Sequence, residues 1–279
     1  MLTYQELMPI TKEIATYVHL YSFSQGVLDE PHAKYITRAF PTFLIQFYFE
    51  FEGGLAEIES NGEKLPIPRN GYINACSTQW IDIFQTQSNS TKRHVKNFKI
   101  DLYPHVLFEV FGISPLELSL LEGSLKEVWG EGYDSLYRAL EEKQSALDMV
   151  HVFEKYFIKK LKNNPQKKPF SPPVFFQQHA SLKDLSQTLG YSERWIQKYH
   201  MEVFGVSFKK AQGVLRFFKT IQSISLHVKT NSPLNLTHLA YESGYFDQAH
   251  FIKEFKRYAG MTPTEYVRQK FGTSVLFFW

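Results

Sequence analysis

Three polar side chains at helical spacing, Arg194, Gln197 and Lys198, could together supply hydrogen bonds to one partner. Positions i, i+3 and i+4 share one face of a helix, so these groups project together. Arginine and lysine donate hydrogen bonds to guanine edges, and glutamine pairs with adenine. If Ser192 caps the helix, this face stays outside while the apolar residues between turn inward. The pattern predicts a surface that reads base edges, with a solvated helix face as the ordinary alternative.

A second polar face is expected after Asp247, the best available helix cap in its segment. It consists of Gln248, Ala249, His250 and Lys253. His250 has two interpretations, because a histidine beside aromatic residues also serves as a buried brace of the turn. Further groups suited to phosphate contacts are Ser192, Arg216, Lys256 and Arg257.

The elements that must position these faces are two copies of one unit, Leu185–Gly205 and Leu239–Gly260. In each copy a Gly-Tyr pair follows the first leucine by five residues, and a second glycine closes the unit. The first glycine permits the left-handed backbone of a tight turn, and the last suits the position just past a helix C-terminus. The second copy has one extra residue between its glycines. A helix, a turn and a recognition helix in tandem are typical of DNA binding.

The helix after each unit has its own start signals. Thr262 is a suitable cap, Pro263 falls at the first helical position, and Glu265 completes a capping box. Ser207 repeats the cap in the first unit. One unit alone would also fit an ordinary all-α bundle, whereas two in tandem favour DNA recognition.

The segment from about Gln177 to Gln269 resembles the double helix-turn-helix domain of the AraC/XylS family of bacterial transcription regulators. The resemblance rests on Gly244-Tyr245, Asp247-Gln248-Ala249-His250-Phe251, Phe255-Lys256, Gly260 and Thr262-Pro263. It implies that one long helix, Phe208 to about Val228, joins the two units, with Arg216-Phe217 at the place of an Arg-Leu pair. His200 stands where the family usually has phenylalanine, and Trp195 adds bulk beside it.

Charge and composition divide the chain into parts. Residues 170–279 have a net charge of +6 and residues 1–169 a net charge of −3, so the basic half holds the repeated unit. Four prolines in residues 163–173 predict a linker. The expected domains are residues 1–162 for sensing and 174–271 for DNA binding, followed by an aromatic tail, 272–279, packed on the last helix. Without a signal peptide or membrane span, and with one cysteine, we expect a cytoplasmic protein with no membrane partner.

The first half is expected to be β-rich and then helical, which gives an α+β fold overall. Thr42–Phe51 and Phe98–Leu102 alternate with the period of strands. Asn61-Gly62 and Asn70-Gly71 predict two hairpin turns. From Ser114 the apolar spacing becomes helical. This half resembles the cupin-like barrel, followed by helices, of a subset of the same regulators.

Aromatic residues of the first half suit either a plain core or an effector pocket. The candidates are Phe47, Phe49, Phe51, Tyr72, Trp80 and Phe84, with Phe43 beside them. The controlling partner is a small-molecule effector or, alternatively, another protein. Double-stranded DNA is the expected partner, with RNA polymerase and a second copy of the chain as further candidates.

An enzymatic role is not expected. The histidines of the first half are scattered without metal-ligand spacing, and Cys76 has no recognisable base nearby, so no catalytic residue, metal or cofactor is predicted. The same DNA-binding module also occurs fused to DNA alkyl-repair proteins. That remote alternative needs several cysteines, and the chain has one.

Overall fold

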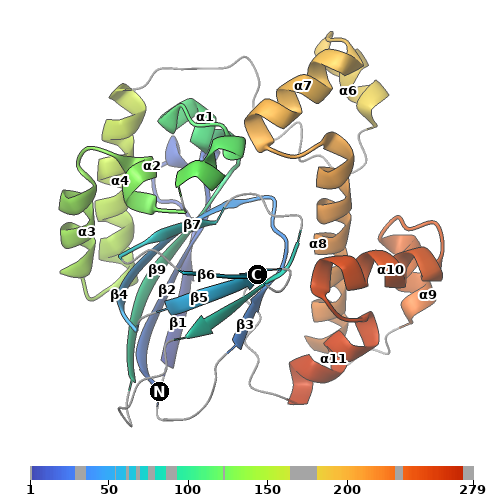
Figure 1. Ribbon diagram of the computed structural model, residues 1–279, viewed down its shortest axis with the longest axis horizontal. Helices are drawn as coiled ribbons and strands as arrows, with labels where there is room; N and C mark the ends of the chain where they lie inside the picture. The colour runs from blue at the N-terminus through green and yellow to red at the C-terminus, as the bar shows by residue number, and fades with distance from the viewer. Residues whose placement is uncertain are drawn as a thin grey trace.

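The computed structural model describes residues 2–28, 36–53, 55–60, 63–66, 70–74, 79–85, 93–121, 123–163, 181–229 and 235–272. The fold is α+β, as predicted. A β-rich part with its own helices lies beside an all-helical part, and the long helix α8 runs through the helical part (Figure 1).

The β-rich part contains two antiparallel sheets. The five-stranded sheet has the order β1 (Leu2–Leu7), β2 (Val18–Leu28), β9 (Arg93–Leu102), β4 (Ile45–Glu52), β7 (Tyr72–Asn74). The four-stranded sheet has the order β3 (Ile36–Ala39), β8 (Ile81–Gln85), β5 (Leu55–Ser60), β6 (Glu63–Pro66). Both predicted strands are confirmed as β4 and β9, which pair with each other.

Helices cover the outer face of the five-stranded sheet (Figure 1). They are the short turns η1 (Ile14–Thr16) and η2 (Pro115–Leu121) and the helices α1 (His105–Phe111), α2 (Leu125–Trp129), α3 (Tyr133–Glu141) and α4 (Ala146–Asn163). Phe47, Phe49 and Phe98 project from β4 and β9 into this helical layer and are 0% exposed. Such alternation buries every second side chain of a strand on one face. This layer is the core of the N-terminal part.

The opposite face of the same sheet is polar. Lys99 and Asp101 form a buried ion pair at 2.9 Å, and the Gln46 amide donates to Asp101 at 2.9 Å. The Asn74 amide in turn donates to Gln46 at 3.0 Å. Desolvation opposes the charge on Lys99, but Tyr48 and the Asp101 carboxylate outweigh it, so the pKa of Lys99 is raised. Because its charges are paired, the network can remain buried.

One predicted hairpin is wrong. The Asn70-Gly71 turn connects β6 to β7, which belong to different sheets. Asn70 adopts a positive φ of 69°, and a Cβ at residue 71 would lie 2.9 Å from the Tyr48 carbonyl oxygen. Glycine is therefore required here by close packing at a sheet crossing, and not by a tight turn between paired strands.

The helical part contains α6 (Leu182–Leu189), α7 (Glu193–Phe204), α8 (Phe208–Lys229), α9 (Leu236–Glu242), α10 (Gln248–Ala259) and α11 (Pro263–Gly272). The predicted connecting helix is confirmed as α8. Gly190, Gly205 and Gly260 adopt left-handed conformations at helix ends, as expected. Thr262 and Glu265 form the predicted capping contacts before α11.

Several predictions fall outside the described residues. They concern the Asn61-Gly62 turn, Cys76, most of the proline-rich linker and the aromatic tail. The domain limits themselves stay predictions. Within the described ranges, no helix is long and apolar enough to cross a membrane. The same ranges contain no group of three or more His, Cys, Asp or Glu residues arranged to hold a metal ion.

His200 makes the folded protein sensitive to acid. The residue is 1% exposed, and Nδ1 lies 2.6 Å from the Val206 carbonyl oxygen, to which a neutral ring can donate. Burial lowers its pKa from 6.5 to about 4, although the bond to Val206 opposes the shift. The folded state thus prefers the neutral ring. The stability this contributes is present above pH 6.5 and is lost as the pH falls toward 4.

We therefore expect His200→Phe to flatten the acid side of the stability profile. Between pH 7 and pH 5, the wild-type free energy of unfolding should fall by about 2 kcal/mol more than that of the variant. Urea unfolding of both proteins at pH 7, 6 and 5 measures this difference. Parallel profiles would contradict the assignment, whatever constant offset the lost hydrogen bond produces.

Candidate nucleic-acid interface

The first polar face lies on α7 and is exposed. The Ser192 hydroxyl accepts a hydrogen bond from the Trp195 backbone N–H at 3.3 Å, which confirms the predicted cap. Arg194, Gln197 and Lys198 are exposed together and make no side-chain hydrogen bond or ion pair with any other described residue. These donors are therefore available to a partner. Ser192 itself is engaged in the cap.

An aromatic stack supports the N-terminal half of α7. The ring of Tyr191 lies 4.3 Å from that of Trp195, which lies 5.0 Å from Tyr199. Trp195, which the sequence identifies as added bulk beside the core, is half-buried and packs against the core of the helical part. The core side of α7 is formed by Ile196 and Phe204, both almost fully buried.

The second polar face lies on α10. Asp247 caps it by accepting from the His250 backbone N–H at 2.7 Å, as predicted. Ala249 and Lys253 are exposed. Gln248 is exposed too, and its side-chain oxygen accepts a hydrogen bond from the Thr237 hydroxyl of α9 at 3.1 Å. Gln248 must therefore exchange this partner to pair with a base.

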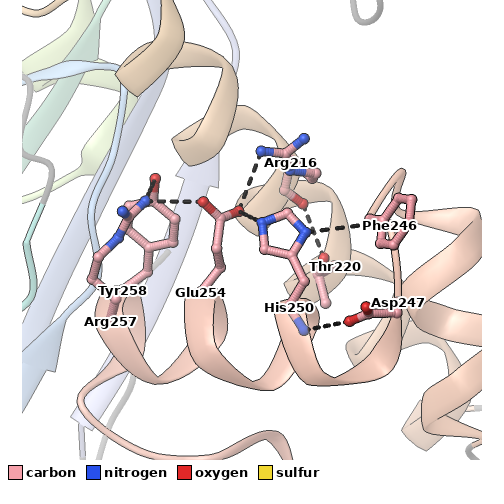
Figure 2. Close-up of polar contacts among 8 residues, drawn as sticks. All are labelled: Arg216, Thr220, Phe246, Asp247, His250, Glu254, Arg257 and Tyr258. Atoms are coloured by element: carbon pink, nitrogen blue, oxygen red, sulfur yellow. Dashed lines mark hydrogen bonds and ion pairs between the residues drawn. The ribbon is translucent and has the colours of Figure 1, made fainter.

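His250 lies within a network inside the unit (Figure 2). Its Nδ1 accepts from the Phe246 backbone N–H at 3.5 Å, and its Nε2 lies 3.9 Å from the Glu254 carboxylate. The Tyr245 ring meets the imidazole edge to face at 5.6 Å. These contacts support the brace, but the His250 side chain is 41% exposed, so base reading by His250 stays a prediction.

Glu254 gathers cations at the centre of α10 (Figure 2). Besides His250, its carboxylate accepts from Arg216 of α8 at 3.2 Å and from Arg257 at 3.1 Å. Arg216 also lies 5.1 Å from the centre of the Tyr245 ring. Arg216 thus ties α10 to α8 and is not assigned as a phosphate contact. Sequence reasoning missed Glu254. Its spacing from His250 and Arg257 on the same helix is a local signal, whereas its pairing with Arg216 of α8 is not.

Lys256 and Arg257, the other phosphate candidates, are exposed on the last turns of α10. The Arg257 guanidinium lies over the Tyr258 ring and is paired with Glu254. Lys256 forms no side-chain hydrogen bond or ion pair in the described part of the chain. Of the two, Lys256 is the one available to a phosphate.

The N-terminal part contacts the end of α10. Arg38 of β3 binds Asp82 through two hydrogen bonds of 2.7 Å, lies 3.9 Å from the centre of the Trp80 ring, and donates to the Ala259 carbonyl at 3.3 Å. A Cβ at Gly260 would be 2.5 Å from the Trp80 indole. The arginine therefore satisfies a carbonyl at the C-terminus of α10. Trp80, an effector-pocket candidate, belongs to this contact instead.

A similar contact reaches the end of α7. The Ser114 hydroxyl donates to the Glu202 carbonyl at 3.1 Å. A Cβ at Gly205 would lie 2.7 Å from Cβ of Pro115. The N-terminal part thus touches the C-terminal ends of both polar-faced helices. No local pattern in the sequence could reveal these contacts between distant residues.

Two phenylalanines before β4 enter the core of the helical part. The Phe40 ring packs edge to face on Phe217 of α8 and on Tyr266 of α11, each at 5.7 Å. The Phe43 ring lies 5.3 Å from Phe204 of α7. Both side chains are nearly fully buried in the cluster that also holds both units together.

The remaining effector-pocket candidates divide between faces. Phe47 and Phe49 lie in the core under the helices, and Phe51 packs on Tyr137 of α3. Tyr72 faces the four-stranded sheet and stacks on Tyr48 at 4.4 Å. The side chain of Phe84 is outside the described residues. The set therefore does not line one pocket, because β4 directs its phenylalanines away from the space between the sheets.

The Helix-turn-helix domain family model matches residues 185–269. Comparison with curated protein sequences gave no match. Among solved structures, ToxT from Vibrio cholerae is 14% identical, with 88% of this chain and 98% of that chain covered and a TM-score of 0.46. ToxT bound to an unsaturated fatty acid is 12% identical, with 92% and 98% covered and a TM-score of 0.46. The C-terminal domain of AraT from Geobacillus stearothermophilus is 21% identical, with 37% and 84% covered and a TM-score of 0.29.

The matched domain spans both capped polar helices and the helix between them. Residues 185–269 therefore form a helix-turn-helix domain of the AraC type, as the sequence predicted.

Proposed function

We propose that one chain reads an asymmetric DNA site by placing α7 and α10 in successive major-groove turns on one side of the duplex, about 10 bp apart. The observation that carries this proposal is a pair of capped helices with exposed polar faces, both packed against the single uninterrupted helix α8. With 22 residues, α8 is about 33 Å long, close to one turn of DNA. The Glu254–Arg216 pair fixes the second unit to it.

Arg194→Ala tests base reading by the first unit. Loss of an arginine that binds a guanine edge should weaken binding at the cognate site by about 1–3 kcal/mol and relax the preference at one base pair. Binding is measured by titration of cognate, base-substituted and random DNA at fixed salt. Arg138→Ala, which removes an exposed arginine of α3, controls for net charge. Equal loss on cognate and random DNA would show that Arg194 contacts phosphate alone.

The N-terminal part, we further propose, receives the signal that controls binding. It contacts the ends of both recognition helices, so a change in it has a direct mechanical route to both. Contacts of this kind support control by a small molecule or by a partner protein equally. RNA polymerase contact and self-association stay predictions.

Reciprocal coupling tests the control. A ligand that biases DNA binding must itself bind with a different affinity when operator DNA is present, by the same factor. Candidate ligands are therefore titrated against the full chain with and without operator. A ligand that binds equally in both cases is not an effector.

A further inference from the structure

Phe246 is the most exposed large apolar residue of the described chain. Its relative exposure is 84%, whereas that of the preceding Tyr245 is 4%. It lies directly before Asp247, the residue that caps α10. In Figure 2 its ring projects from the turn at the N-terminal end of the helix. A fully solvated phenylalanine at this place calls for an explanation, because it stabilises no core.

The comparison of the two units shows that this turn holds the extra residue. Gly205 follows the cap Ser192 by 13 positions, and Gly260 follows the cap Asp247 by 13 positions. The recognition helices are thus equal in length. The added residue therefore lies between Gly244 and its helix cap, where the second unit has Tyr245 and Phe246.

A structural role would be a hydrophobic staple, in which the residue before the cap packs on the fourth helical residue. That partner is Phe251, whose ring contacts are with Tyr245 and Phe255. Within the described residues, Phe246 has no ring contact. Tyr245 has taken the packing position, which leaves Phe246 outside.

In the first unit, the residue directly before the helix cap is packed differently. Tyr191, directly before its cap, is folded back onto Trp195. In the second unit the equivalent of Trp195 is His250, which receives the backbone N–H of Phe246 and leaves its ring unsupported. The two units therefore present different chemistry at the same end of the recognition helix, and only the second presents a free apolar group there.

We propose that Phe246 enters the major groove with α10 and contacts the 5-methyl group of a thymine. The inference rests on the proposed function, because it takes α10 as a recognition helix. The N-terminal residues of such a helix reach base edges, and the thymine methyl is the one apolar group that those edges display. Ala249, exposed one turn further along, is small enough to leave room for the base pair, and Lys253 follows on the same face.

Base analogues test this contact on the full chain. Each thymine of the bound site is replaced in turn by deoxyuridine, which removes the methyl group and keeps every hydrogen-bonding group. At one position, wild-type affinity should fall about fourfold, the loss expected for one buried methyl group. Phe246→Ala should bind the thymine site on the order of tenfold more weakly and should no longer distinguish thymine from deoxyuridine there.

Phe246→Leu, which keeps an apolar group, should retain much of the discrimination. The salt dependence of Phe246→Ala should equal that of the wild type, since no charge is removed. Thermal unfolding should also be unchanged, because the side chain is solvated.

Two results would overturn the proposal: Phe246→Ala with wild-type affinity, or Phe246→Ala with the same response to deoxyuridine as the wild type. Failure of the proposed function would look different, because the wild-type chain would then show no preference among DNA sequences at all.

Discussion

Five base pairs inserted between the two half-sites should abolish specific binding. The insertion turns the second half-site by about half a turn, to the opposite side of the duplex. Since both recognition helices are packed on α8, and Arg216 with Glu254 fixes one of them, the second unit cannot follow. Affinity should fall to that for random DNA, a loss of at least about a thousandfold given the usual ratio of specific to non-specific binding.

An insertion of ten base pairs provides the sharper comparison. This insertion returns the second half-site to the original side of the duplex. It also adds about one further turn of separation between the half-sites, which a single helix of fixed length cannot span. We expect this site to be bound as poorly as the five-pair site. Footprinting and competition with random DNA measure both. If the ten-pair insertion recovers binding, the two units move independently and α8 does not set their spacing.

Gly260→Ala should destabilise the full chain by about 2–5 kcal/mol. Gly260 has a φ of 70°, and a residue with a side chain pays about 1–2 kcal/mol there. The added Cβ would also lie 2.5 Å from the Trp80 indole and 2.9 Å from the Arg38 guanidinium. Moving this stacked pair away from α10 should cost a further 1–3 kcal/mol, roughly. Denaturant unfolding of the full chain gives the total.

Gly190→Ala is the matched control. Gly190 has the same φ of 70° at the end of α6, but a Cβ at this position would have no described atom within 4 Å. It should therefore show the backbone cost alone. The difference between the two variants reports the contact between the N-terminal part and α10. Equal decreases in the free energy of unfolding would mean that Arg38 and Trp80 move aside at no energetic cost, and that this contact is weak.

Local signals made the C-terminal part predictable. Caps such as Ser192 and Asp247 and the left-handed glycines act within one turn of their own helix, so sequence spacing alone locates them. The exposure of Arg194, Gln197 and Lys198 followed from the same periodicity. These residues do not need distant partners to take their places.

Long-range contacts account for what the sequence left open. Alternation shows that a strand has two faces but not which face meets the helices, so the sequence leaves Phe47 and Phe49 as either core or pocket residues, and the structure buries both in the core. Arg216 has the sequence signature of a free cation, yet Glu254 of α10 pairs with it from the neighbouring helix. A carboxylate on a neighbouring helix can pair with an arginine whose partner the sequence does not reveal.

Phe40 and Phe43 connect the two halves of the chain across the boundary that composition predicts. The chain divides by composition near residues 163–173, yet these two rings, from the first half, complete the core of the second. Excising the DNA-binding half at that boundary would expose the surfaces of Phe217, Tyr266 and Phe204 that they cover. Heating the intact chain should therefore produce one shared calorimetric transition, in which the two halves melt together.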